Sequence, residues 1–240
     1  RDYDVVIIGA GPAGIFAALE LTKKNKDINI LMVDKGRTID KRHCPARATG
    51  KCANCDPCAI VSGWSGAGAF SDGKLTQSPD VGGRIKDYIS EDEAEELMRY
   101  TDRIYLDFGA APEVYGLNSK RVEDIMYEAS KYNIQLIPSP VRHLGTELSC
   151  RVLERMYEHL VNNTHTTFLE LTSAKEILSA GGRASGVILG QKDRGDIEVR
   201  ADYVIVAPGR EGAEWLGGQA KKLGIRTENN EVDIGVRVEV

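Results

Sequence analysis

The sequence lacks several features that would assign it to common classes of protein. Aromatic residues make up only 6% of its 240 positions, and the net charge is −5 with lysine and arginine scattered along the chain. A nucleic-acid-binding surface needs clustered positive charge, so we expect no nucleic-acid partner. No apolar run approaches the roughly 20 residues that cross a bilayer, and no basic and apolar leader opens the chain. We therefore expect a soluble, cytoplasmic protein with no membrane partner.

Cysteine is scarce outside one short segment. Four of the five cysteines lie within the segment from Cys44 to Cys58, which suits metal or redox chemistry in a reducing compartment better than a disulfide framework. Two C-x2-C steps can bring three thiolates to one centre, which would bind zinc or an iron–sulfur cluster. The spacing also allows redox-active thiols, or reduced thiols on a loop, and these alternatives stay open. The candidate metal ligands are Cys44, Cys52, Cys55 and Cys58.

What the sequence does contain is the composition of a globular protein, with 42% hydrophobic and 28% charged residues. This length suits one large domain or two small ones. The chain opens at Arg1 without a methionine and ends in "VDIGVRVEV", a pattern that predicts a strand. We therefore expect a piece of a longer protein.

The amino-terminal residues predict a βαβ unit. The β-branched run over Tyr3–Ile8 has no polar alternation after Asp4, as in a parallel strand that is buried on both faces. The segment "GAGPAG" follows, and then apolar residues at helical spacing, with Pro12 suited to a first helical turn. A second strand is predicted over Ile28–Val33 and ends at Asp34.

Each glycine of "GAGPAG" has a physical use at the turn between the first strand and the helix. The first allows a tight turn, the second lets the backbone approach a pyrophosphate, and the third allows close packing of helix on strand. The phosphates would lie at the helix amino terminus. We expect the cofactor-binding residues of this turn to be Gly9, Gly11, Pro12, Ala13 and Gly14.

An acid at the end of the second strand completes the dinucleotide pattern. Asp34 lies 20 positions after Gly14, where a carboxylate can accept from both ribose hydroxyls. An acid disfavours a 2′-phosphate, so the adenosine half of FAD or NAD is favoured, although Lys35 and Arg37 keep NADP open. We place Asp34 and Lys35 among the cofactor-binding residues.

The middle of the chain predicts a long loop followed by helices. Residues 36–83 are rich in glycine and cysteine, and loops of this length are usually functional or disordered. Helices are predicted over Glu91–Phe108, over Ser119–Tyr132 and from Thr146, a candidate N-cap, to about Val161.

From Thr166 onward the pattern changes to strands. The segments "TFLEL", "AKEILSA", "SGVILGQ" and "DIEVRA" are short and separated by turn residues, which predicts a small antiparallel meander. A further buried strand is predicted over Tyr203–Ala207.

Three segments carry a resemblance to a known family. "DVVIIGAGPAGIFAALEL", the meander over Ala174–Ala201 and "YVIVAPGREG" are together similar to the FAD-binding domain of the glutathione-reductase-type flavoprotein superfamily. In that superfamily an Ala-x-Gly turn reaches the cofactor, which implies Ala207 and Gly209 here. More narrowly, "GWSGAGAFSDGKL" resembles a bacterial group described only as uncharacterised FAD-dependent dehydrogenases. The superfamily's closing Gly-Asp turn has no match in this chain.

The glycine-rich loop that carries the narrower resemblance suits a flavin. Its glycines allow close backbone approach, and its polar side chains can bond the ribityl chain or the ring edge. The alternative is a surface loop without a ligand. The candidate residues are Gly66, Gly68, Ser71, Asp72, Gly73 and Lys74. Arg142 and His143 are weaker candidates for contact with an anion or with the cofactor.

These inferences predict an α/β fold, a Rossmann-like doubly wound parallel sheet with an antiparallel β-meander and a helical insertion. We expect the FAD-binding domain over 1–83 and 141–240 and the insertion over 84–140. The predicted function is FAD-dependent oxidoreduction, with a small-molecule substrate and an electron donor or acceptor as partners. The alternatives are a non-redox enzyme resembling thiazole synthase, which uses NAD as a substrate, and a metal-bearing nucleotide-binding module without turnover.

Overall fold

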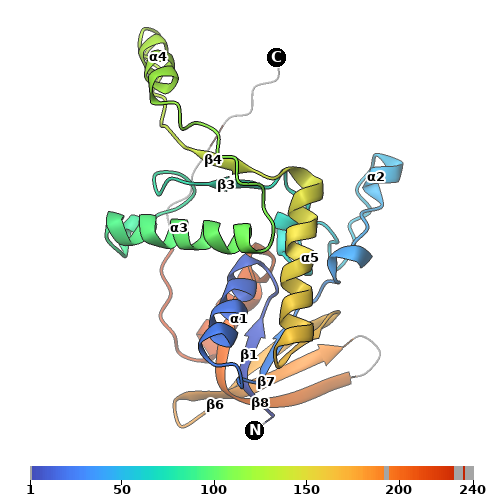
Figure 1. Ribbon diagram of the computed structural model, residues 1–240. Coiled ribbons are helices and arrows are strands. Elements are labelled where there is room, and N and C mark those ends of the chain that lie inside the picture. The colour runs from blue at the N-terminus through green and yellow to red at the C-terminus, as the bar shows by residue number, and fades with distance from the viewer. Residues whose placement is uncertain (1, 192–194, 230–234, 236–240) are drawn as a thin grey trace.

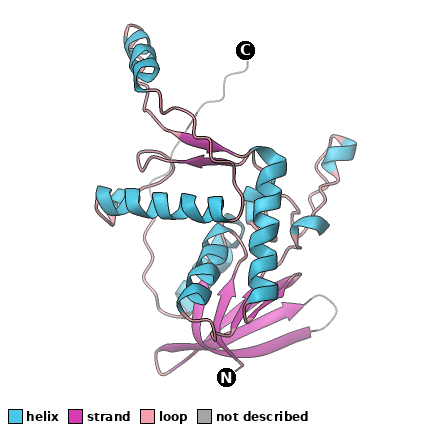
Figure 2. Ribbon diagram, viewed as in Figure 1, coloured by secondary structure: helices cyan, strands magenta, loops and turns pink. Residues whose placement is uncertain are grey.

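The computed structural model describes residues 2–191, 195–229 and 235. A six-stranded sheet with the strand order β5-β2-β1-β8-β7-β6 forms its base (Figure 1, Figure 2). Strands β5, β2, β1 and β8 are parallel to one another, and β8, β7 and β6 are antiparallel. The bounds are β1 Tyr3–Ile8, β2 Ile30–Val33, β5 Thr166–Leu169, β6 Thr172–Ala180, β7 Arg183–Gln191 and β8 Gly195–Val206.

Two details of the strand prediction were wrong. The "TFLEL" segment forms β5, which pairs parallel with β2 through contacts such as Met32 with Phe168, so it belongs to the parallel sheet and not to the meander. The segments "DIEVRA" and "YVIVA" form one strand, β8, because no turn residue separates them. Its first part pairs with β7 and its second part, from Ala201, pairs with β1. The predicted strand at the carboxyl terminus lies outside the described residues except at Gly235.

Alternate residues of the central strands feed two separate cores. On one face Val5, Ile7 and Met32 pack with buried residues of α1 and α5. On the other face Val6 and Ile8 pack with the meander, including Val187 and Leu189. Both sets are almost fully buried, which explains why β1 is apolar without interruption.

The helices differ in length and in how closely they approach the sheet. Helix α1 follows β1, α5 runs beside it, α3 lies across the upper end of α1, and α4 projects away from the other helices (Figure 1). Strands β3 and β4 form a separate antiparallel pair. The helices are α1 Pro12–Lys24, α2 Ala46–Thr49, α3 Glu91–Asp107, α4 Ser119–Ser130, α5 Gly145–Asn163 and α6 Ala213–Lys222; the short strands are β3 Lys74–Thr76 and β4 Val141–His143.

Helix α5 begins one residue before the predicted N-cap. Thr146 lies inside the first turn, because the buried Leu144 donates its N–H to the Gly73 carbonyl at 2.9 Å and fixes the chain just before it. Val152, Met156 and Leu160 of this helix are fully buried and pack into the core.

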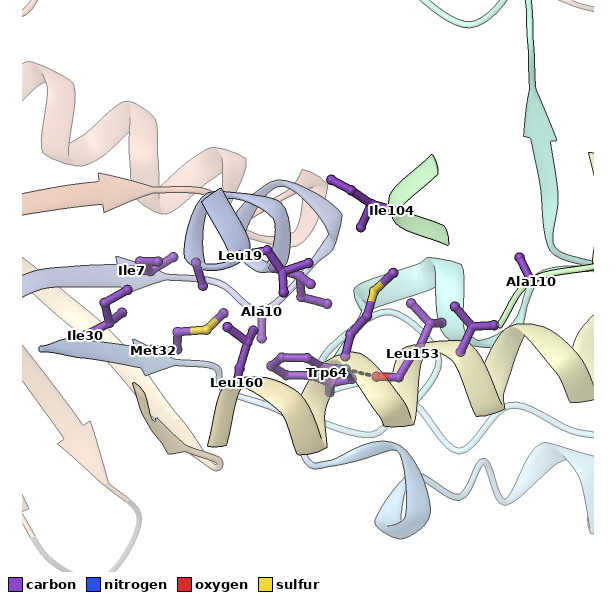
Figure 3. Close-up of a cluster of buried hydrophobic side chains, with 14 of the residues drawn as sticks. Ile7, Ala10, Leu19, Ile30, Met32, Trp64, Ile104, Ala110, Leu153 and Leu160 are labelled. Atoms are coloured by element: carbon purple, nitrogen blue, oxygen red, sulfur yellow. Dashed lines mark hydrogen bonds between the residues drawn. The ribbon is translucent and has the colours of Figure 1, made fainter. Parts of the chain in front are cut away.

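Trp64 is the largest fully buried side chain in the described chain and connects the long loop to the core. Its Nε1 donates to the Leu153 carbonyl at 2.9 Å (Figure 3). Its ring meets Tyr157 and Phe168 edge to face. The part of the long loop around Trp64 is therefore packed against α5.

The observed architecture confirms the predicted α/β, Rossmann-like class, with a mostly parallel sheet, an antiparallel meander and helices on the sheet. Helices α3 and α4 occupy the segment 84–140 in which we expect an insertion. Within the described ranges, none of the helices has the length and apolar character needed to cross a membrane.

Candidate functional site

The turn between β1 and α1 contains glycines with two different roles. A Cβ on Gly9 would lie 2.1 Å from the Ala207 carbonyl oxygen, and one on Gly14 would lie 2.0 Å from the Gly9 carbonyl oxygen. These two glycines permit close packing of strand and helix. A Cβ on Gly11, by contrast, would meet nothing within 4 Å in the described chain. Its φ of −73° also suits any residue, so the backbone there does not require a glycine. Gly11 therefore faces open space.

That open space lies in front of the amino terminus of α1. Gly11 is the N-cap, Pro12 begins the helix, and both Pro12 and Ala13 are exposed. Within the described residues no side chain caps this end, and the first turn contains no acid. The helix therefore presents free N–H groups and its positive dipole end outward, which is the arrangement that binds phosphate.

Asp34 joins the glycine turn to two further segments. Its Oδ2 accepts from the Ala10 N–H at 2.9 Å, and its Oδ1 accepts from the N–H groups of Gly36 at 2.8 Å and Gly63 at 2.7 Å. A carboxylate has about four acceptor positions, so one position on Oδ2 is left for a ligand. Asp34 was expected to accept from both ribose hydroxyls, which would need two free positions where one is left.

The glycine-rich loop reaches the same place through its backbone. Ser65, in the left-handed region at φ 67°, donates its N–H to the Ala10 carbonyl at 2.6 Å. A Cβ on Gly66 would lie 3.5 Å from the Gly11 Cα. Gly66 thus lies beside Gly11, at the edge of the open space.

Sequence reasoning missed two glycines that hold this arrangement. A Cβ on Gly36 would lie 2.3 Å from the Gly63 nitrogen, and a Cβ on Gly63 would lie 2.3 Å from the Arg37 carbonyl oxygen. Gly36 and Gly63 therefore allow two loop segments to touch, and both donate to Asp34. In the sequence, Gly36 and Gly63 are marked only as glycines in a glycine-rich segment that follows Asp34.

Arg42 fixes the shape of the loop from inside. Its guanidinium is buried and donates to the carbonyls of Ala59 at 2.9 Å, Ile60 at 2.7 Å and Trp64 at 2.6 Å. Burial lowers the pKa of Arg42 to about 10. One side chain thus holds the residues on both sides of Ser62 and Gly63.

A cavity of about 240 Å³ opens beside Asp34. Its walls combine apolar side chains from the sheet and α6 with an ion pair, Lys35 with Glu211 at 2.9 Å. Pro208 lines it directly, whereas Gly209, in the left-handed region at φ 63°, lies next along the chain. The lining residues are Ile8, Gly9, Val33, Asp34, Lys35, Val61, Ser62, Thr172, Ser173, Ala174, Pro208, Glu211, Gly212 and Trp215.

Several predicted site residues contact one another and not this cavity. Ser71 Oγ donates to the Gly68 carbonyl at 2.9 Å and accepts from the Gly73 N–H at 3.2 Å. Asp72 pairs with Lys74 at 2.7 Å, with both side chains exposed, and this bond lowers the pKa of Asp72. A Cβ on Gly73 would lie 3.0 Å from the Gly145 carbonyl oxygen, so the missing side chain there serves packing.

The predicted metal site is not formed. Within residues 2–191, 195–229 and 235, no group of three or more histidine, cysteine, aspartate or glutamate side chains is arranged to hold a metal ion. Cys52 and Cys55 are exposed, Cys44 and Cys58 are half-buried, and all four are free thiols. Cys52 Sγ accepts from the Asn54 N–H at 3.4 Å, so this thiol is hydrogen-bonded to the backbone of its own turn.

Arg142, a weaker candidate for contact with an anion, has a structural partner. It forms a two-pronged ion pair with Asp102, at 2.6 Å from Nε to Oδ1 and 2.7 Å from Nη2 to Oδ2. The side chains are only 4% and 13% exposed. This pair connects β4 to α3 and leaves His143 exposed on the short strand.

Comparison with solved structures shows similar folds at low sequence identity. The Sdh1 complex of Mycobacterium smegmatis matches 92% of this chain and 38% of its own, with a TM-score of 0.53 and 17% identity. L-amino acid deaminase from Proteus vulgaris matches 94% of this chain with a TM-score of 0.51 and 15% identity. The chain spans 50% of the deaminase.

Sequence comparison gives a curated relative and a family. A protein of Clostridium beijerinckii, described as an uncharacterized protein, is 38% identical over 95 residues, which cover 39% of this chain and 16% of the relative. The glycine turn, Asp34, the cysteine segment and the glycine-rich loop all lie within residues 3–131, more than half of the chain, which match a family sequence pattern. By that match the chain belongs to the pyridine nucleotide-disulphide oxidoreductase family.

Proposed function

We propose that this chain is the FAD-binding part of an FAD-dependent oxidoreductase that transfers hydride between a small-molecule substrate and the flavin. The observation that carries the proposal is the open space at Gly11, between the uncapped start of α1 and the cavity at Asp34. Membership of the pyridine nucleotide-disulphide oxidoreductase family supports it. FAD, when bound, would supply the hydride-accepting chemistry.

The chain's own residues would bind and orient the cofactor. The N–H groups at the start of α1 would hold the pyrophosphate, since no side chain of the described chain occupies that position. The remaining lone pair of Asp34 Oδ2 would accept from a ribose hydroxyl. Trp215 and Ala174 offer apolar surface in the adjoining cavity for the adenine. A separate electron donor or acceptor would complete the reaction.

The replacement of Gly11 by valine tests this binding mode. The backbone at Gly11 is extended, with φ −73° and ψ −179°, and a Cβ there meets nothing in the described residues, so Gly11→Val should fold normally. The valine methyl groups would occupy the proposed pyrophosphate position. We expect FAD affinity to fall at least about tenfold, or about 1.4 kcal/mol, with an unchanged thermal midpoint.

The measurement is FAD titration followed by absorbance, on protein purified without added cofactor, where an oxidised flavin absorbs near ~450 nm. Gly83→Val is the matched control, because a Cβ there also meets nothing in the described chain and Gly83 lies on an exposed loop. Equal FAD binding by Gly11→Val and the wild type would overturn the binding mode. A bound nicotinamide-derived nucleotide in place of flavin would overturn the FAD assignment.

A further inference from the structure

Ser62 is an unusual residue in this structure. It is 4% exposed, and its Oγ is, within the described residues, the single buried side-chain nitrogen or oxygen without a hydrogen-bond partner. A buried hydroxyl without a partner destabilises a fold, and most such groups are therefore paired. The group that satisfies the Ser62 hydroxyl must come from outside the described protein atoms.

The position of Ser62 shows where that partner would lie. Ser62 lines both the cavity at Asp34 and a second cavity of about 500 Å³ that Lys35 also lines. The next residue, Gly63, donates its N–H to Asp34 Oδ1 at 2.7 Å. A Cβ on Gly36 would lie 2.3 Å from the Ser62 carbonyl carbon, so this segment is pressed against the chain that follows Asp34.

The backbone around Ser62 holds the hydroxyl in place. Ser62 donates its N–H to the Cys58 carbonyl at 3.0 Å, and Trp64 donates its N–H to the Arg37 carbonyl at 3.0 Å. The buried guanidinium of Arg42 binds carbonyls on both sides, at Ile60 and Trp64. The hydroxyl is therefore preorganised before any ligand arrives, which reduces the entropic cost of binding.

The acceptor capacity of Asp34 defines what the hydroxyl would bind. A ribose presents two neighbouring hydroxyls, and Asp34 has one free acceptor position after its three backbone bonds. We propose that Ser62 Oγ binds the second hydroxyl of the adenosine ribose, so that Asp34 and Ser62 together form the ribose site. This inference rests on the proposed dinucleotide-binding function.

The Ser62→Ala variant tests the ribose site through three nucleotides: ADP, 2′-deoxy-ADP and 3′-deoxy-ADP. We expect the wild type to bind ADP about five- to tenfold more tightly than either deoxy analogue, because each analogue loses one hydrogen bond, to Asp34 or to Ser62. In Ser62→Ala the preference over one analogue should disappear, whereas the preference over the other should remain, because Asp34 is unchanged. FAD affinity should fall by a similar factor. The thermal midpoint of the nucleotide-free variant should equal or exceed that of the wild type, because an unpaired buried group has been removed.

Ser149→Ala is the matched control, a buried serine on α5 outside the lining of the cavity at Asp34, and should leave all affinities unchanged. A Ser62→Ala variant that weakens ADP and both analogues equally, or that keeps its preference for ADP over both analogues, overturns the inference and leaves the FAD proposal in place. The latter outcome would assign a bound water to Ser62. A wild type that binds neither FAD nor ADP overturns both proposals.

Discussion

Single residues in this protein do structural work that their type alone does not reveal. Asp34 sits at the position where a ribose-binding acid is expected, yet it accepts three backbone N–H groups and so joins three segments. Arg142 had the sequence position of an anion ligand, yet it is paired with Asp102 inside the protein. The acceptor and donor positions of these charged side chains are therefore largely used within the fold, which limits what remains for a ligand.

The buried Asp102–Arg142 pair gives a prediction at the scale of one residue. Removal of the carboxylate in Asp102→Ala would leave the Arg142 charge buried without a partner, so we expect a loss of about 3–5 kcal/mol in unfolding free energy. The hydrogen bond from Arg142 lowers the pKa of Asp102. Its contribution is therefore complete above the ordinary aspartate pKa of about 3.9 and is lost as the pH falls below it.

Urea unfolding at several pH values measures this effect. The acid-induced loss of stability should be smaller in Asp102→Ala than in the wild type. Asp72→Asn is the control, because the exposed Asp72–Lys74 pair is screened by solvent and its loss should leave the unfolding midpoint unchanged. A small effect of Asp102→Ala would show that the pair is solvated.

Helices with similar sequence patterns differ in how they are packed. Helix α5 buries Val152, Met156 and Leu160 completely, whereas α4 contains no buried residue in the described chain. Both have apolar residues at helical spacing. Helix α4 projects away from the sheet (Figure 1), so its apolar face contributes little to the stability of this fold.

This contrast predicts opposite outcomes for two substitutions. Met156→Ala should cost about 2–5 kcal/mol of unfolding free energy, because it leaves a cavity in the core. Ile125→Lys on α4 should change it by less than about 0.5 kcal/mol, since Ile125 is 46% exposed. Thermal unfolding of the two variants beside the wild type is the measurement. A large loss in Ile125→Lys would mean that another surface covers this face of α4.

The whole molecule consists of a sheet with a core on each face and loops attached at its edges. The cysteine segment lies on such a loop, while Cys150 lies on α5 with its Sγ 3.2 Å from the Ala69 carbonyl oxygen. Burial raises the pKa of Cys150, which reduces its reactive thiolate fraction. The exposed thiols of the cysteine segment should therefore react more readily than the Cys150 thiol.

Thiol labelling measures this difference in reactivity. We expect iodoacetamide to modify the exposed Cys52 and Cys55 in the native protein faster than Cys150, which is partly buried and has a raised pKa. Mass spectrometry of native and urea-unfolded samples measures this, and all five cysteines should react in urea. Protection of Cys52 and Cys55 that a chelator removes would contradict the structure and restore a metal site.

The sequence alone was sufficient for the class of fold and for the glycine turn of the dinucleotide pattern. Both depend on local signals: an unbroken apolar strand, glycines at fixed spacing and apolar residues at helical spacing. The helix predicted over Glu91–Phe108 is observed over Glu91–Asp107, and a capping box between the neighbouring residues Ser90 and Glu93 fixes its start.

The tertiary structure decided how distant segments share these residues. The β-type pattern of "TFLEL" predicts a strand but not the strand with which it pairs. Only the packed sheet places β5 beside β2. The two C-x2-C steps are compatible with a metal centre, yet in the described residues the thiols do not form a group that could hold a metal ion. The unpaired hydroxyl of Ser62 and the three bonds of Asp34 exist only once segments far apart in the chain meet, because hydrogen-bond satisfaction is a property of the folded structure.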